Sequence, residues 1–128
     1  MLEFIENGDI EEIKKKGKMI TDYSDIQINR IVEGAESINL KVGELVVPAY
    51  NLISGEYVSV VGNKLSVLHN KPAIMFSIKS HSVKFSIRSI DGQSPNALGF
   101  AKMLGGGGHE NSAGAEIPLS DFIKMIVE

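Results

Sequence analysis

Residues 105–114 read GGGGHENSAG, and this stretch decides how the whole chain is interpreted. Four consecutive glycines cost backbone entropy when they are ordered, and flexible linkers contain similar runs. Here a helix-like apolar pattern precedes the run and a strand-like pattern follows it. Consecutive N–H groups without Cβ atoms can form a concave anion site, to which His109 could donate. The sequence therefore predicts an ordered glycine loop that binds phosphate, with a helix C-cap as the alternative role for His109.

The strand pattern before the glycine run carries a second candidate residue. Residues 83–88 alternate apolar and polar side chains, as a half-buried strand does, and Arg88 falls on the polar side. A guanidinium binds phosphate oxygens through two parallel N–H groups and stacks on bases. Neighbouring serines, including Ser89, add hydroxyl donors. The spacing predicts a small anion pocket between the strand that carries Arg88 and the loop that carries His109.

The remaining patterns predict an α+β fold. Alternation or compact apolar runs indicate five strands, at residues 38–42, 45–50, 73–78, 83–88 and 113–117. Helical apolar spacing indicates three helices, at about residues 57–68, 94–104 and 120–127. We therefore expect a sheet of about five strands with flanking helices.

The first part of the chain has a different pattern. Asp9 and Glu12 fit a capping box, and isoleucines from residue 10 to residue 31 recur near one helical face. Gly34 is a typical helix stop. The sequence predicts a long N-terminal helix ending near residue 33, within a helical connector over residues 1–36.

The composition excludes several classes of protein. The chain has 128 residues, with 13 Lys and Arg against 16 Asp and Glu, and contains no Cys. Without Cys it has no disulfide scaffold, thiolate zinc site or cysteine nucleophile. No apolar run reaches the roughly 18–20 residues of a membrane span, and the acidic start does not fit a signal peptide. We therefore expect a cytoplasmic protein without a membrane partner.

The charge is unevenly distributed. Residues 1–36 carry five basic and nine acidic side chains, a local net of −4, whereas residues 64–102 carry six basic and one acidic, a net of +5. The basic segment can attract a phosphorylated ligand, and a solvated surface is the alternative interpretation.

These patterns together resemble a known family. Residues 83–89, residues 96–101, and the GGGGH run followed by Ser112-Ala113-Gly114 are similar to the DHHA1 domain. That domain is the C-terminal substrate-binding domain of DHH-family phosphoesterases. Ser112 differs from the Ala that the family usually has. The resemblance covers residues 37–128 and implies a DHHA1-type mixed β-sheet. The acidic N-terminal helix resembles the connector of the nanoRNase and exopolyphosphatase-like branch.

The resemblance also implies a division of labour between two domains. A covalently linked DHH domain holds two metal ions, usually manganese, and a metal-activated water attacks the phosphodiester. The DHHA1 domain holds the distal end of a short oligonucleotide, nucleotide or polyphosphate. Phosphate, base or the terminal nucleotide would contact Arg88, Ser89, Gly106, Gly107, Gly108 and His109.

The sequence contains no Asp-His-His triplet, and its five Asp and three His have no metal-ligand spacing. We therefore predict that this chain binds without cleaving, with no catalytic residue and no metal of its own. Two alternatives stay open. One is a stand-alone nucleic-acid-binding or regulatory module, since related domains end alanyl-tRNA synthetases. The other is a structural domain that forms a homodimer through its acidic helix.

Overall fold

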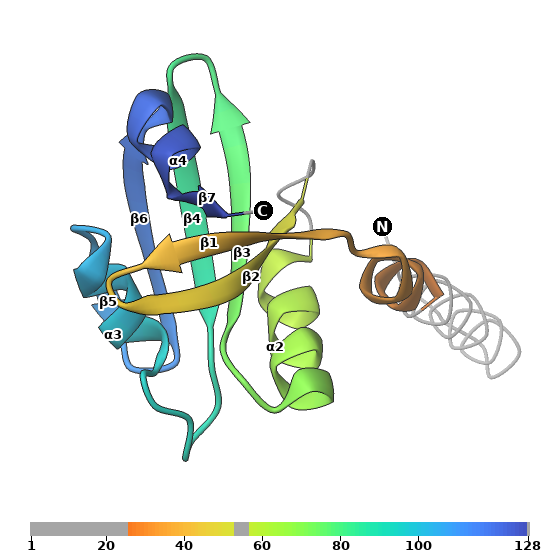
Figure 1. Cartoon of the computed structure of the whole chain (residues 1–128). Helices are drawn as coiled ribbons and strands as arrows, with labels where there is room; N and C mark the ends of the chain where they lie inside the picture. Colours follow the sequence, from red (N-terminus) through yellow and green to blue (C-terminus); the bar gives the residue numbers. More distant parts are fainter. Residues whose placement is uncertain (1–25, 53–56, 128) are drawn as a thin grey trace, which may run out of the picture.

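The computed structural model describes residues 26–52 and 57–127, and within them seven strands form one mixed sheet (Figure 1). The strand order is β5-β6-β4-β3-β2-β1-β7. The pairing of β2 with β3 is parallel, and the other neighbouring strands pair antiparallel. The strands are β1 (Ser37–Val42), β2 (Leu45–Asn51), β3 (Ala73–Lys79), β4 (Ser82–Arg88), β5 (Gly107–His109), β6 (Ser112–Pro118) and β7 (Ile126–Val127). The labelled helices are α2 (Val58–His69), α3 (Ala97–Met103) and α4 (Leu119–Met125).

The α+β class is confirmed, but the expected count of about five strands is wrong. The first additional strand, β5, lies inside the glycine run, because Gly107, Gly108 and His109 pair with β6. Glycine has a low strand propensity, so the sequence pattern favoured a loop there. The second is β7, which pairs with β1 at the opposite edge of the sheet. Its two apolar residues fit the helical pattern of the preceding segment as well, so periodicity could not separate them.

The described part of the predicted N-terminal helix is a short helix of nine residues, 26–34. Ile28 is buried, and Ile31 and Val32 pack against the same cluster as Tyr50 of β2. The rest of the long helix predicted from Asp9 lies outside the described residues. This short helix is therefore the part of the prediction that the structure supports.

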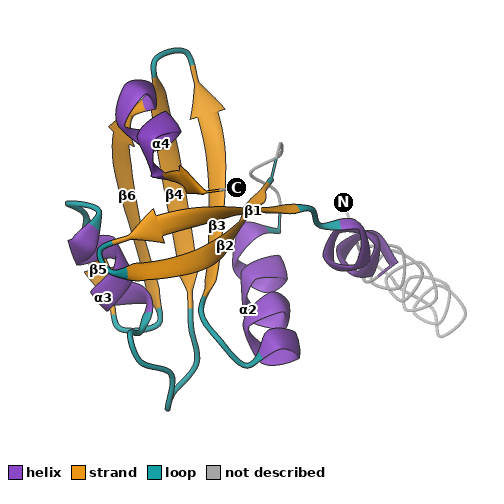
Figure 2. Ribbon diagram, in the orientation of Figure 1, coloured by secondary structure: helices purple, strands orange, loops and turns teal. Residues whose placement is uncertain are grey.

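The two sides of the sheet are covered differently (Figure 2). The side that we call the α3–α4 face carries a core in which Phe122 of α4 packs against Phe76 and Phe85, with ring centroids 5.0 and 5.9 Å apart. The side that we call the α2 face carries a smaller core, in which Met75 of β3 packs with Leu65 of α2. Because α2 contacts β3 and β4, it leaves the β6 and β5 part of its face to polar residues.

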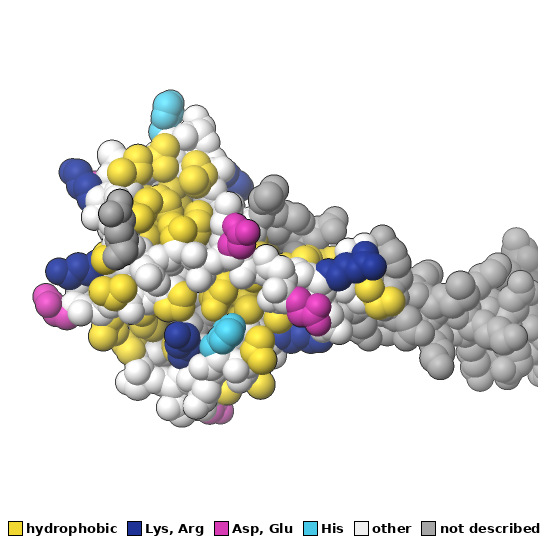
Figure 3. Space-filling view, turned by 45° about the vertical axis from the view of Figure 1, so that its right-hand side comes forward, with side chains coloured by type: hydrophobic (Ala, Val, Ile, Leu, Met, Phe, Trp, Pro, Cys, Tyr) yellow, Lys and Arg dark blue, Asp and Glu magenta, His cyan; other side chains and the backbone are white. Residues whose placement is uncertain are grey.

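Some large hydrophobic side chains remain outside both cores. Val46, Ile78, Met103 and Ile123 are each at least half exposed. Figure 3 shows yellow side chains on both the upper and the lower part of the visible surface. No described helix is long and apolar enough to cross a membrane.

Candidate functional site

A line of three polar side chains crosses three strands on the α2 face. Arg88 of β4 pairs in register with Ser112 of β6, which in turn pairs with His109 of β5. Directly opposite residues in neighbouring strands project from the same face of a sheet. Strands lie about 4.8 Å apart, so about 10 Å separates the Arg88 and His109 backbones. The structure thus brings together the two residues from which the sequence predicted an anion pocket.

The next line across the same strands carries almost no side chain. Ser86 of β4 pairs with Gly114 of β6, and Gly114 pairs with Gly107 of β5. Gly107 is exposed, and a Cβ built on it would have no atom within 4 Å. The two glycines therefore leave backbone uncovered beside the line of Arg88, Ser112 and His109. A ligand on this face can approach the main chain closely here.

Arg88 is held in place by its own strand and by helix α2. It is half-buried, and its Nη1 donates to the Ile87 carbonyl oxygen at 3.0 Å. Its Nη2 donates to the Ser59 hydroxyl oxygen at 3.2 Å. Burial lowers the pKa of Arg88 from its ordinary value, yet a guanidinium stays charged in proteins. Of the five N–H donors of the guanidinium group, most remain available to a ligand.

Helix α2 fits over Arg88 because residue 62 is a glycine. A Cβ at Gly62 would lie 2.5 Å from the Met75 Cε atom and 2.7 Å from the Arg88 Cγ atom. The aliphatic part of Arg88 therefore packs directly against the helix backbone. Gly62 and Ser59 together position the guanidinium, one by leaving room and the other by accepting a hydrogen bond.

The glycine run has two structural roles, which its sequence alone does not distinguish. It ends α3 in a Schellman motif, in which the Gly106 N–H donates to the Ala101 carbonyl oxygen at 2.7 Å and Gly105 has a φ of +83°. It also brings β5 close against β6. A Cβ at Gly106 would overlap the Gly114 carbonyl oxygen, and one at Gly108 would lie 2.7 Å from the Ala113 Cα atom. Gly106 and Gly108 are thus required by packing, whereas Gly107 faces open space.

Ser89 lies apart from the other candidate residues, because it follows Arg88 and turns toward the α3–α4 face. It is only 4% exposed, and its hydroxyl oxygen accepts from the Ala97 N–H at 2.8 Å. The same hydroxyl donates to Asn111 Oδ1, also at 2.8 Å. Ser89 therefore ties the start of α3 to the turn between β5 and β6. Its predicted contact with a ligand stays a prediction, and the structure supplies a different reason for a serine here.

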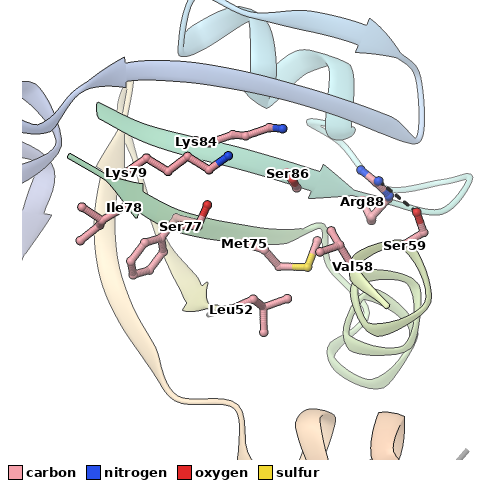
Figure 4. Close-up of a pocket in the computed structure, with 11 residues that line it drawn as sticks. Leu52, Val58, Ser59, Met75, Ser77, Ile78, Lys79, Lys84, Ser86 and Arg88 are labelled. Carbon is pink, nitrogen blue, oxygen red and sulfur yellow. Dashed lines mark hydrogen bonds between the residues drawn. The ribbon is translucent and has the colours of Figure 1, made fainter. Parts of the chain in front are cut away.

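A pocket of about 500 Å³ adjoins Arg88 on the α2 face (Figure 4). Ser59 and Arg88 stand at one end of it, whereas Lys79 and Lys84 extend from neighbouring strands at the other. The alternation that placed Arg88 on a polar face also applies to Lys84, four residues earlier, so the sequence offered a signal for it. Nothing in the sequence pattern pointed to Ser59, which reaches the site through the packing of α2.

The pocket is positively charged. None of the residues that line it is a carboxylate, and the first turn of α2 has no acidic residue. On the same face, Glu116 of β6 pairs with Lys84, but its Oε1 accepts from the Ser82 hydroxyl at 2.8 Å. This electrostatic arrangement favours an anionic ligand.

A protein-family model matches the part of the chain that carries this site. The model of the DHHA1 domain matches residues 45–128, which include the Arg88 strand and the glycine run. The chain belongs to the DHHA1 domain family. Such domains are associated with DHH phosphoesterases, so the family that the sequence analysis named is confirmed, although the branch is not resolved. Curated proteins include none that matches the chain.

The DHHA1 domain described here does not supply a metal centre. Within residues 26–52 and 57–127, no group of three or more His, Cys, Asp or Glu side chains could hold a metal ion. These residues therefore do not fit the two manganese ions expected of a DHH phosphoesterase, and no hydrolytic step is derived from them. What they can do chemically is bind an anion and orient it.

Proposed function

We propose that this DHHA1 domain is the substrate-binding module of a phosphoesterase that hydrolyses phosphodiester or phosphoanhydride bonds. Its ligand is the phosphate-bearing end of an oligonucleotide, a nucleotide or a polyphosphate. The catalytic site, with its two manganese ions, belongs to a DHH domain of the nanoRNase or exopolyphosphatase-like branch. The observation that carries the proposal is the in-register line of Arg88, Ser112 and His109.

The chemistry of this line suits a phosphate group. Arg88 offers a planar fork of N–H donors that Ser59 and the Ile87 carbonyl already orient, so little side-chain entropy is lost on binding. Exposed His109 adds a donor on the opposite side, and the exposed Ser112 hydroxyl lies between the two. Gly107 has no side chain to cover the backbone on the same face, so a ligand can approach closely there. A phosphate can therefore receive several hydrogen bonds at once, which is how proteins hold it tightly.

Calorimetric titration of the full chain with a 5′-phosphorylated dinucleotide tests the proposal. Arg88→Ala and His109→Ala should each weaken binding by about 10- to 100-fold, because a charge-assisted hydrogen bond contributes roughly 1.5–3 kcal/mol. Raising the salt concentration should weaken the unmodified chain as well.

Two exposed residues serve as matched controls. Lys102→Ala on α3 removes a positive charge from the other face, and His81→Ala removes an imidazole from the turn between β3 and β4. Both should leave the affinity within about twofold. If Arg88→Ala and His109→Ala bind as tightly as these controls, the line across the sheet is not the ligand site.

A further inference from the structure

The pocket runs along the α2 face well beyond the line of Arg88, Ser112 and His109. Lys84 lies four residues from Arg88 on β4, which places their backbones about 13 Å apart on the same face. Lys79 lies further away, because it pairs with Ser82, which is six residues or about 20 Å from Arg88 along β4. An extended ligand can therefore place one anionic group at Arg88 and another between the two lysines.

Lys79 and Lys84 form a pair of cations, and the neighbouring carboxylate of Glu116 accepts a hydrogen bond from Ser82 and does not line the pocket. Lys79 pairs with Ser82 and Lys84 pairs with Ser77, so the two lysines are diagonal neighbours, roughly 7–8 Å apart at the backbone. Both are exposed, and their ammonium groups form no ion pair with the described residues. Figure 4 shows the two side chains extending in the same direction, toward the middle of the pocket. An anion between them would relieve the repulsion of two like charges.

Ser77 and Ser86 lie between the lysines and Arg88, and beside them the pocket has an apolar wall. Leu52, Val58 and Met75 line it, and Met75 is buried at its base. Serines complete the lining, at positions 59, 77 and 86. The pocket therefore offers a cationic end, an apolar wall and a second cationic end. A flat base fits the wall better than water or a bare phosphate chain does, because covering apolar surface is favourable.

We infer that Lys79 and Lys84 form a second anion subsite, which binds a phosphate further along a linear oligonucleotide. The first phosphate lies near Arg88 and His109, and an intervening nucleoside covers Leu52, Val58 and Met75. This inference rests on the proposed function for the first phosphate only. With two subsites, the affinity of the domain depends on the length of the ligand, since a mononucleotide reaches one subsite and a longer oligonucleotide reaches both.

The test compares two ligands on the full chain, adenosine 5′-monophosphate and a 5′-phosphorylated five-nucleotide oligoadenylate. The unmodified chain should bind the five-nucleotide ligand at least tenfold more tightly. In the double variant Lys79→Ala/Lys84→Ala this difference should fall to about twofold, while the mononucleotide affinity stays unchanged. The slope of log affinity against log salt for the longer ligand should decrease by about 0.7, because the two lysines together hold one phosphate.

The matched control is Lys102→Ala/Lys124→Ala, which removes the same charge from exposed positions on α3 and α4. The inference is overturned if this control reduces the length dependence as much as the Lys79 and Lys84 variant does. It is also overturned if the unmodified chain binds both ligands equally. A polyphosphate with as many phosphates should bind more weakly than the oligonucleotide, and equal binding would contradict the role of the apolar wall.

The proposed function fails separately. Arg88→Ala should weaken both ligands by a similar factor, because it acts on the first phosphate. If Arg88→Ala has no effect but the lysine variant still reduces the length dependence, the second subsite stands and the first assignment is wrong. Since both lysines are exposed, the variants should unfold at the same temperature as the unmodified chain.

Discussion

The two faces of strand β4 have different roles, since one packs into the core and the other lines the pocket. On the α3–α4 face, Val83, Phe85 and Ile87 are at most 1% exposed and form the centre of the larger core. On the α2 face, Lys84 is exposed and Arg88 is half-buried beside a pocket. Because side chains alternate along a strand, stability and ligand contact are assigned to different residues of the same seven-residue segment. Substitutions on one face should therefore change folding, and those on the other face should change binding.

The largest expected effect is on the α3–α4 face. Phe85→Ala should lower the free energy of unfolding by about 3–5 kcal/mol, because it leaves a cavity beside Phe122 in a core that cannot collapse fully. Urea denaturation followed by circular dichroism measures it. The neighbouring Ser86→Ala, on the α2 face, should stay within about 0.5 kcal/mol. Similar losses for both variants would break the division between the two faces.

An intermediate effect is expected from adjacent glycines that point to opposite faces. Gly106→Ala should destabilise the domain by about 1–3 kcal/mol, because its methyl group would overlap the Gly114 carbonyl oxygen. Gly107→Ala should leave the unfolding free energy within about 0.5 kcal/mol, since its methyl group meets open space. That same methyl group should weaken ligand binding, because it covers the backbone beside His109. Denaturation and calorimetry on both variants measure the two effects, and a stability loss at Gly107 equal to that at Gly106 would refute the assignment.

The smallest effect concerns Ser89, which the sequence placed among the ligand-binding residues. Ser89→Ala should cost about 1–2 kcal/mol of stability, because it leaves the Ala97 N–H buried without its acceptor. The dissociation constant for a 5′-phosphorylated dinucleotide should stay within about twofold, as the hydroxyl contacts α3 and not the α2 face. A binding loss as large as that of Arg88→Ala, with unchanged stability, would show that Ser89 contacts the ligand.

Much of the fold was predictable where one periodicity was strong. The expected helix at residues 57–68 corresponds to α2, and the expected strands at 73–78 and 83–88 correspond to β3 and β4. The helical spacing of α2 and the alternation in β4 each indicate one element type, whereas β3 was predicted from a short compact apolar run. β5 was missed because glycines carry no pattern, and its pairing depends on how closely β6 approaches.

The part of the candidate site that lies on strand β4 and on the glycine run was predictable from the sequence. Arg88 and His109 follow from residue type and position, and the register then aligns them. The sequence could not show that α2 packs across β4, so Ser59 and Gly62 went unnoticed. It also could not separate Gly106 and Gly108, which serve packing, from Gly107, because all three look identical in a glycine run.

The position of β5 has a consequence for native-state fluctuations. β5 is a three-residue edge strand, whereas β4 is paired along its full length on both sides. Opening β5 breaks few hydrogen bonds, so its amide hydrogens should exchange with solvent far sooner than those of β4. The line from Arg88 to His109 therefore joins the most protected part of the sheet to one of its least protected parts. A ligand that bridges the two ends should therefore slow exchange in β5, and ordering this edge costs part of its binding free energy.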